Sequence, residues 1–138
     1  MIALTVEHIK HGAHQLALET MGWDEPIPPF ATRYPHILES CLAMPWQKFD
    51  NHLLYRGFAA KAAILFYLLI KNHPFQNGNK RIAVTSMFLF LYLNKQWLRV
   101  DDRDLYNVAV WIASSPPQAK DEVISFLQKY IRKHSITL

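Results

Sequence analysis

Residues 58–70 read FAAKAAILFYLLI and residues 82–93 read IAVTSMFLFLYL, and these two stretches decide the fold. Both are apolar on nearly every side of a helix, which predicts two buried helices at the centre of the molecule, over residues 56–71 and 79–95. Each apolar run is shorter than the ~20 residues that a membrane-spanning helix needs. The two runs therefore indicate core helices, and no membrane partner is expected.

Shorter patterns on either side complete an all-α bundle. Thr5, Asp101 and Ser115 are residue types that begin helices, and each stands before an apolar pattern. Four prolines mark a loop after the first helix. The sequence predicts helices over residues 4–21, 37–43, 101–114 and 115–133, a loop over 22–35, and a small β-hairpin or irregular flap over 45–55.

The composition is that of one folded domain over residues 1–138, because 51% of the residues are hydrophobic and the length suits a single core. Cys41 is the only cysteine, which excludes an internal disulfide and a cysteine metal cluster and predicts a small buried side chain. The N-terminal residues lack the basic and apolar regions of a secretory signal. We therefore expect a cytoplasmic protein.

The distribution of charge predicts an anionic ligand. The net charge is +4, and residues 51–100 contain no Asp or Glu but seven Lys or Arg residues. These basic residues lie on the core helices and their junction rather than on an exposed polar face, so nucleic acid is a less favoured anion than a nucleotide.

The junction between the two central helices, residues 73–81, reads HPFQNGNKR. Pro74 excludes His73 from helical geometry and so ends the helix predicted over residues 56–71. Phe75 is expected to anchor the loop in the core. Gly78 allows a close approach of a ligand to the backbone, and Asn79 is a residue type that caps a helix.

The helix that follows this junction carries unfavourable charges in its first turn. Its first turn carries Lys80 and Arg81, where the helix dipole favours acidic residues. A bound anion would resolve the conflict, so Gly78, Asn79, Lys80 and Arg81 are predicted to form a phosphate site. The neighbouring His73 is of the type that accepts a proton near neutral pH and is the candidate general base.

The string from His73 to Arg81 resembles the signature H-P-F-x-[D/E]-G-N-[G/K]-R of the Fic/Doc superfamily. Residues 38–45, LESCLAMP, resemble the L-E-S-A-L-A-R-P element of its death-on-curing (Doc) branch, with Met44 in place of an arginine. The segments 61–63, 72–75, 79–83 and 90–94 also match that branch in order. The resemblance extends over almost the whole chain.

This resemblance implies a Fic-type helical bundle and transfer of part of a nucleoside triphosphate, such as ATP, to a hydroxyl of a target protein. The segment from Pro45 to Tyr55 would be a flap that positions the target peptide. The implied residue roles are general base for His73, buried anchor for Phe75, anion hole for Gly78 and Asn79, and ligand of the terminal phosphate for Arg81.

Three positions depart from the patterns of the family or of its adenylylating members. Asn77 stands where the family signature has the carboxylate that binds Mg²⁺, so Mg²⁺ is the expected metal but Asn77 offers it only an amide oxygen without charge. Compared with the adenylylating relatives, Lys80 replaces a glycine and Val84 replaces an arginine. Lys80 is typical of the Doc branch, in which the nucleotide binds in reverse and the terminal phosphoryl group moves. That branch acts on a Tu-type elongation factor. The sequence lacks the [S/T]-x-x-x-E-[G/N] element of self-inhibited relatives, so inhibition by a separate antitoxin protein is expected.

Several alternatives remain open at this stage. The chain can be an adenylyltransferase that transfers AMP, a non-catalytic binding protein in which Asn77 has abolished metal-assisted chemistry, or a basic nucleic-acid-binding module. His8, His11 and His14 recur every third residue, but they spread over ~120° of a helix, so they indicate a solvated or partly buried face rather than a metal site.

Overall fold

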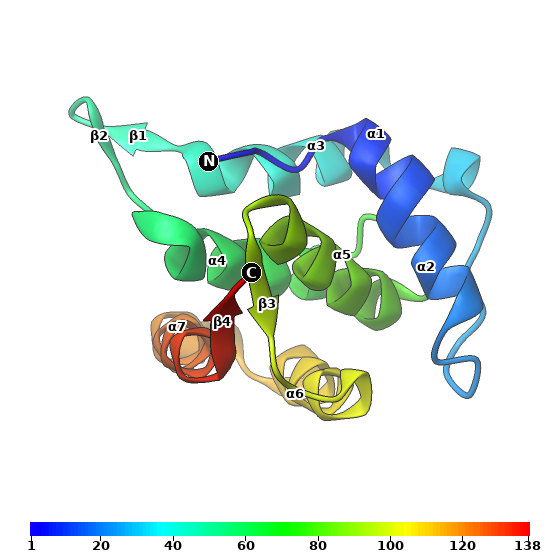
Figure 1. Cartoon of the computed structure of the whole chain (residues 1–138). Coiled ribbons are helices and arrows are strands. Elements are labelled where there is room, and N and C mark those ends of the chain that lie inside the picture. Colours follow the sequence, from blue (N-terminus) through cyan, green and yellow to red (C-terminus); the bar gives the residue numbers. More distant parts are fainter.

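The computed structural model describes residues 1–138 and has α4 (Gly57–Lys71) at its centre (Figure 1). Every residue from Ala59 to Ile70 is buried, because α4 packs against α5 (Asn79–Leu93) and is also covered by the helices α3, α6 and α7. A helix that is apolar all round is stable only when it is covered on all sides. The prediction of two central core helices is confirmed.

The other helices form layers on either side of this pair. In Figure 1, α1 and α3 lie above α4 and α5, the N-terminal run continues down into α2 beside α5, and α6 and α7 lie below. The bounds are α1 (Val6–His8), a π-helical segment (Ile9–Ala13), α2 (His14–Glu19), α3 (Pro35–Ala43), α6 (Asp102–Ser114) and α7 (Lys120–His134), with 3-10 turns at Phe30–Thr32, Met44–Trp46 and Pro117–Ala119.

A two-stranded hairpin precedes α4 and consists of β1 (Lys48–Phe49) and β2 (His52–Leu53). The strands are antiparallel, with Phe49 opposite His52. Asp50 and Asn51, which join them, have φ angles of 49° and 64°. Positive φ at both central residues is the geometry of a tight hairpin turn that Asn and Asp tolerate. The predicted all-α bundle with a short β-hairpin is therefore confirmed.

A second small sheet was not predicted. Strand β3 (Gln96–Leu98) pairs antiparallel with β4 (Ser135–Thr137) at the end of the chain, with Trp97 opposite Ile136. Helix α5 accordingly ends at Leu93, not at residue 95 as predicted. Three-residue strands that lie far apart in sequence carry no local periodicity, which is why sequence patterns missed them.

The predicted helix starts are confirmed in two places and wrong in a third. Thr5 caps α1 by accepting from the N–H of His8, and Asp101 caps α6 by accepting from the N–H of Arg103. Ser115 does not cap the last helix. It ends α6, and its hydroxyl donates to the carbonyl of Ile112 at 2.6 Å, so that α7 begins only at Lys120 after a 3-10 turn.

Cys41 is buried in α3, as predicted. Burial raises the pKa of its thiol to about 11, because the thiolate would lose its hydration. A side chain in this state is a small apolar core residue. None of the helices combines the length and the apolar character that a membrane span requires.

Candidate functional site

The junction between α4 and α5 has two backbone positions in the left-handed region. Helix α4 ends at Lys71 with Asn72 as its C-cap, and the next residue, His73, has a φ of 50°. Pro74 excludes His73 from the right-handed helical region, as expected from the sequence. Gly78 has a φ of 71° and is the N-cap of α5. The chain thus leaves one core helix and enters the next through two sharp turns.

The side chain of Asn79 holds this loop together. Its oxygen accepts from the N–H of Phe75 at 3.0 Å, and its amide donates to the carbonyl of Phe75 at 2.9 Å. Asn79 is therefore not the helix cap that the sequence suggested, because Gly78 takes that position. Its side-chain hydrogen-bonding groups are used within the protein rather than offered to a ligand.

Phe75 lies inside the core with 1% of its surface exposed. Its ring is 5.9 Å from that of Phe30 and 6.0 Å from that of His14, measured between ring centroids. The carbonyl of Pro74 accepts from the N–H of Tyr34 at 2.8 Å. The loop is thus pinned from the inside by an aromatic ring and from the outside by the segment before α3.

His73 is exposed, and its Nδ1 atom lies 3.4 Å from the amide nitrogen of Asn79. The amide oxygen of Asn79 already accepts from the N–H of Phe75, so the nitrogen of Asn79 is the donor to Nδ1 of His73. In the neutral imidazole Nδ1 then carries the lone pair and Nε2 carries the proton. The long distance makes this a weak restraint on the ring.

Lys80 and a residue of the loop between α2 and α3 form an ion pair beside His73. The Nζ atom of Lys80 lies 3.5 Å from the carboxylate of Glu25, and the two side chains are 25% and 46% exposed. Sequence patterns did not single out Glu25, since it lies in a proline-rich loop far away in the chain. Only the fold brings this acidic residue to the candidate site.

The guanidinium of Arg81 points into the protein. The side chain is 4% exposed and donates to the carbonyl oxygens of Ala17, Thr20 and Glu25, the last at 2.7 Å. Ala17 and Thr20 lie at the C-terminal end of α2, where carbonyl groups lack helical partners and attract cations. The expectation that Lys80 and Arg81 require an external anion therefore does not hold, because the protein supplies partners to both.

Gly78 is needed by the protein for its own packing. A Cβ atom at this position would lie 2.5 Å from the Cδ1 atom of Ile27 and 3.4 Å from the carbonyl oxygen of Pro26. The close approach predicted for a ligand is thus made by the loop between α2 and α3. The same loop carries Glu25, and Trp23 fixes it to α6 by edge-on packing against Tyr106 at 4.7 Å.

A cavity of about 230 Å³ opens at this junction. Ligand pockets usually measure roughly 300–1,000 Å³, so this one suits a part of a nucleotide, such as its phosphate groups. Helix α5 has no side-chain cap, which leaves the N–H groups of its first turn free for an anion. Neither Gly78 nor Arg81 lines the cavity, and its polar lining consists of Glu25, His73, Gln76, Asn77, Asn79 and Lys80.

The cavity offers few ligands for a metal ion. Its lining includes the amide of Asn77 and one carboxylate, that of Glu25, and the structure contains no group of three His, Cys, Asp or Glu residues that could bind a metal. Mg²⁺ in phosphate-transfer sites commonly takes one or two carboxylates and fills its shell with phosphate oxygens and water. Asn77 and Glu25 fit the small protein share of such a coordination shell, in which phosphate oxygens and water would supply the other ligands.

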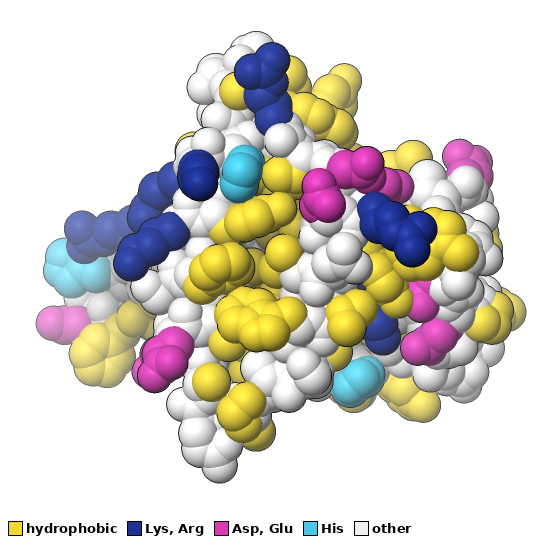
Figure 2. Space-filling model, turned by 90° about the horizontal axis from the view of Figure 1, so that it is seen from below, with side chains coloured by type: hydrophobic (Ala, Val, Ile, Leu, Met, Phe, Trp, Pro, Cys, Tyr) yellow, Lys and Arg dark blue, Asp and Glu magenta, His cyan; other side chains and the backbone are white.

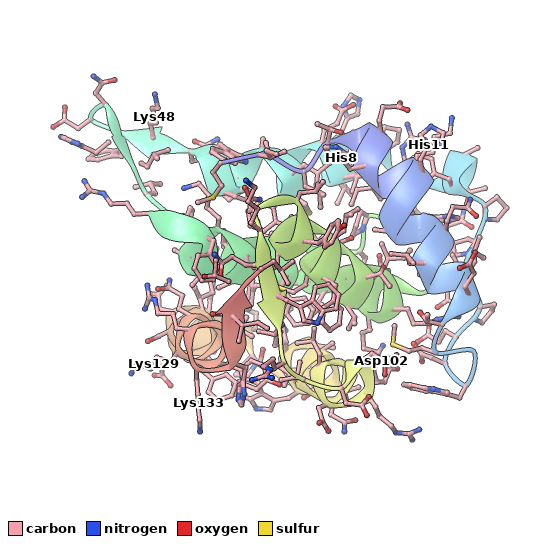
Figure 3. All side chains as sticks on the ribbon, viewed as in Figure 1. His8, His11, Lys48, Asp102, Lys129 and Lys133 are labelled. Carbon is pink, nitrogen blue, oxygen red and sulfur yellow. The ribbon has the colours of Figure 1, made fainter.

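Other candidate residues lie away from this cavity. The hairpin precedes the first turn of α4 and His73 follows its last, so the helix separates them by about 22 Å, and no hairpin residue lines the cavity. The ring of His8 accepts from the N–H of Thr5 at the start of the N-terminal helix, His11 is exposed beside Glu7, and Lys48 lies on the hairpin (Figure 3). His14 is buried, and its Nε2 atom lies 2.8 Å from the carbonyl oxygen of Pro28. The three histidines therefore do not form one site.

Comparison with known proteins gives one match. A model of the Fic/DOC family matches residues 3–91, which is more than half of the chain and includes α4, the junction and all but the last two residues of α5. No curated protein and no solved structure matches the chain. On the strength of this match, the chain belongs to the Fic/DOC family.

Proposed function

We propose that this protein transfers the terminal phosphoryl group of a nucleoside triphosphate, such as ATP, to a hydroxyl group of a target protein. The observation that carries the proposal is that His73 and Lys80 line one cavity at the uncapped N-terminus of α5. This arrangement combines a proton acceptor with a cation and free N–H groups, the two requirements of phosphoryl transfer. Membership of the Fic/DOC family supports nucleotide-dependent modification of proteins.

In the proposed reaction the target hydroxyl attacks the terminal phosphorus. A bond forms between the hydroxyl oxygen and phosphorus, the bond from phosphorus to the bridging oxygen breaks, and the nucleoside diphosphate leaves with that oxygen. The hydroxyl proton passes to the imidazole of His73. Because the contact of Nδ1 with Asn79 is long and therefore weak, little hydrogen-bond energy is lost when the imidazole ring turns so that Nδ1 accepts the proton.

Lys80 and the backbone N–H groups of residues 79–81 would stabilise the phosphate charge. In this role Asn79 and Arg81 act through their backbone, and their side chains hold the loop in place. Glu25 must leave Lys80 when the nucleotide binds, because the carboxylate and a phosphate would compete for the same ammonium group. A bound Mg²⁺ would neutralise phosphate charge, and Asn77 and Glu25 would hold it.

The direction of transfer rests on Lys80. Its side chain occupies space where the adenylylating relatives have a glycine, which favours a reversed triphosphate with its terminal phosphorus near His73. A chain of the Doc type would be a toxin, with an elongation factor of the Tu type as a cytoplasmic target and a separate antitoxin protein as its inhibitor.

The test uses the purified chain, a cell extract and ATP labelled on either the terminal or the innermost phosphorus. We expect terminal label on a discrete protein band, lost in His73→Ala and kept in His36→Ala, an exposed histidine of α3. Innermost label would overturn the proposal in favour of adenylylation. If neither form of labelled ATP gives a band that disappears in His73→Ala, the chain is a binding protein and not a transferase.

The toxin role has a separate test. Expression of the chain alone in bacteria is expected to arrest growth, because the sequence lacks the inhibitory element of self-restrained relatives. The His73→Ala variant at the same protein level is the control and should allow growth. Normal growth of cells that produce the unaltered chain would contradict the toxin role.

A further inference from the structure

The outer face of α6 and α7 carries aromatic side chains that nothing in the structure covers. Trp111 of α6 is 45% exposed and Phe126 of α7 is 44% exposed, and their rings meet edge to face at 5.0 Å. Tyr130 continues the row at 5.9 Å from Phe126. Figure 2 shows hydrophobic side chains gathered in the middle of this face, with basic side chains on the α7 side.

Two hollows lie beside these rings. They measure about 450 Å³ and 360 Å³, and Trp111 and Phe126 line both of them. Glu122 borders the larger hollow. The face thus has a protruding aromatic ridge with space next to it, a shape that can receive a ridge of the same kind.

Charge is arranged along α7 in a self-complementary way. Glu122, Phe126 and Lys129 are all exposed and fall on one narrow stripe, since positions i, i+4 and i+7 share a helix face. Lys129 lies about 10.5 Å along the helix from Glu122, and Phe126 about 6 Å, so the phenyl ring is close to the midpoint. Lys129 and Lys133 project from the outer side of α7 (Figure 3).

We propose that this face binds a second copy of the chain through an antiparallel pairing of α7 with its counterpart. A two-fold axis near Phe126 places Glu122 of each copy opposite Lys129 of the other, with the aromatic ridges packed between the two ion pairs. A two-fold interface requires such a self-complementary patch, because each residue contacts the other copy twice. The proposal is independent of the proposed phosphoryl transfer.

Analytical ultracentrifugation over about three orders of magnitude in concentration tests the pairing. The mass should rise from that of a 16.1 kDa monomer toward twice that value. Phe126→Glu should abolish this rise, whereas His73→Ala should leave it unchanged. A monomer at every concentration would overturn the proposal and leave the face to another occupant.

Charge reversal tests the register of the two helices. Glu122→Lys and Lys129→Glu should each weaken the dimer about tenfold, since like charges then face each other twice. A mixture of the two variants should dimerise as well as the unaltered chain, because each contact again joins an acid and a base. Lys10→Glu, an exposed site on the N-terminal helical run, is the matched control and should have no effect. Failure of the mixture to dimerise would overturn this mode of pairing.

Discussion

The junction of α4 and α5 and the outer face of α6 and α7 use their side chains in opposite ways. At the junction, polar groups are bound to other parts of the chain: Arg81 to three carbonyl groups, Asn79 to the loop, and Lys80 to Glu25. On the outer face, Trp111 and Phe126 are nearly half exposed, and their rings form a row with that of Tyr130. The junction is an internally supported site, whereas the face is a surface available for binding.

This difference separates two kinds of evidence for function. Polar residues at the junction are explained largely by their internal partners, so their presence alone does not identify a ligand. Half-exposed aromatic rings have no such internal explanation, because exposure to water forgoes the roughly 25 cal/mol that burial gains for each Å² of apolar surface. Substitutions should therefore change stability and nucleotide chemistry at the junction, and only assembly at the face.

The largest expected effect is at Arg81. Arg81→Ala should lower the free energy of unfolding by about 3–5 kcal/mol, because it leaves carbonyl groups at the end of α2 without donors. Urea unfolding measures this difference. Arg132→Ala, an exposed position on α7, is the matched control and should change stability by less than about 0.5 kcal/mol. Equal effects would contradict the contrast between the two regions.

Gly57 and Gly78 both have a positive φ, so substitutions at the two positions can separate backbone strain from steric contact. Gly78→Ala should destabilise the protein by about 2 kcal/mol, since it combines a φ of 71° with a Cβ atom 2.5 Å from Ile27. Gly57→Ala has a φ of 80° but no neighbour within 4 Å and should cost only about 1 kcal/mol. Thermal unfolding of both variants checks the order, and a reversed order would show that Ile27 does not restrict Gly78.

Glu25 should limit nucleotide binding. Glu25→Gln is expected to tighten the binding of ATP about three- to tenfold in the absence of magnesium, because it frees Lys80 and removes a negative charge from the cavity. Titration of a fluorescent ATP analogue measures this change, with Glu39→Gln on α3 as the control. Unchanged affinity would mean that the phosphates do not reach Lys80.

Asn77 tests the metal site. Asn77→Asp should lower the magnesium concentration that gives half-maximal label transfer about threefold, since Mg²⁺ prefers a charged oxygen ligand. Asn107→Asp makes the same chemical change on the α6 face and should leave magnesium dependence unaltered. If the two variants respond alike, the metal does not bind at Asn77.

The smallest expected effect is a gain of stability at His73. His73→Gly should raise the free energy of unfolding by about 0.5–1 kcal/mol, because a non-glycine residue is strained at a φ of 50°. The same variant should lose label transfer. Stability from chemical denaturation and activity are measured on one preparation, and lower stability would show that the imidazole supports the loop.

Local patterns predicted the helices well and the contacts of the site poorly. Continuous apolar runs predicted α4 and α5, and Pro74 predicted the end of α4, because these are effects of neighbouring residues. The strands β3 and β4 and the position of Glu25 were missed, since they depend on residues far apart in the chain. Ser115 was assigned to the wrong helix because a serine can bond to the turn before it as well as to the turn after it.

The sequence by itself determined that this protein is an all-α bundle with a distinctive junction between two core helices, since helical periodicity and the constraints of proline and glycine act locally. Only the tertiary structure decided what the polar residues of that junction contact. Packing of the loop after α2 against α5 directs Arg81 inward, brings Glu25 to Lys80 and leaves His73 at the cavity. Such contacts depend on how distant segments meet, and no local pattern encodes that geometry.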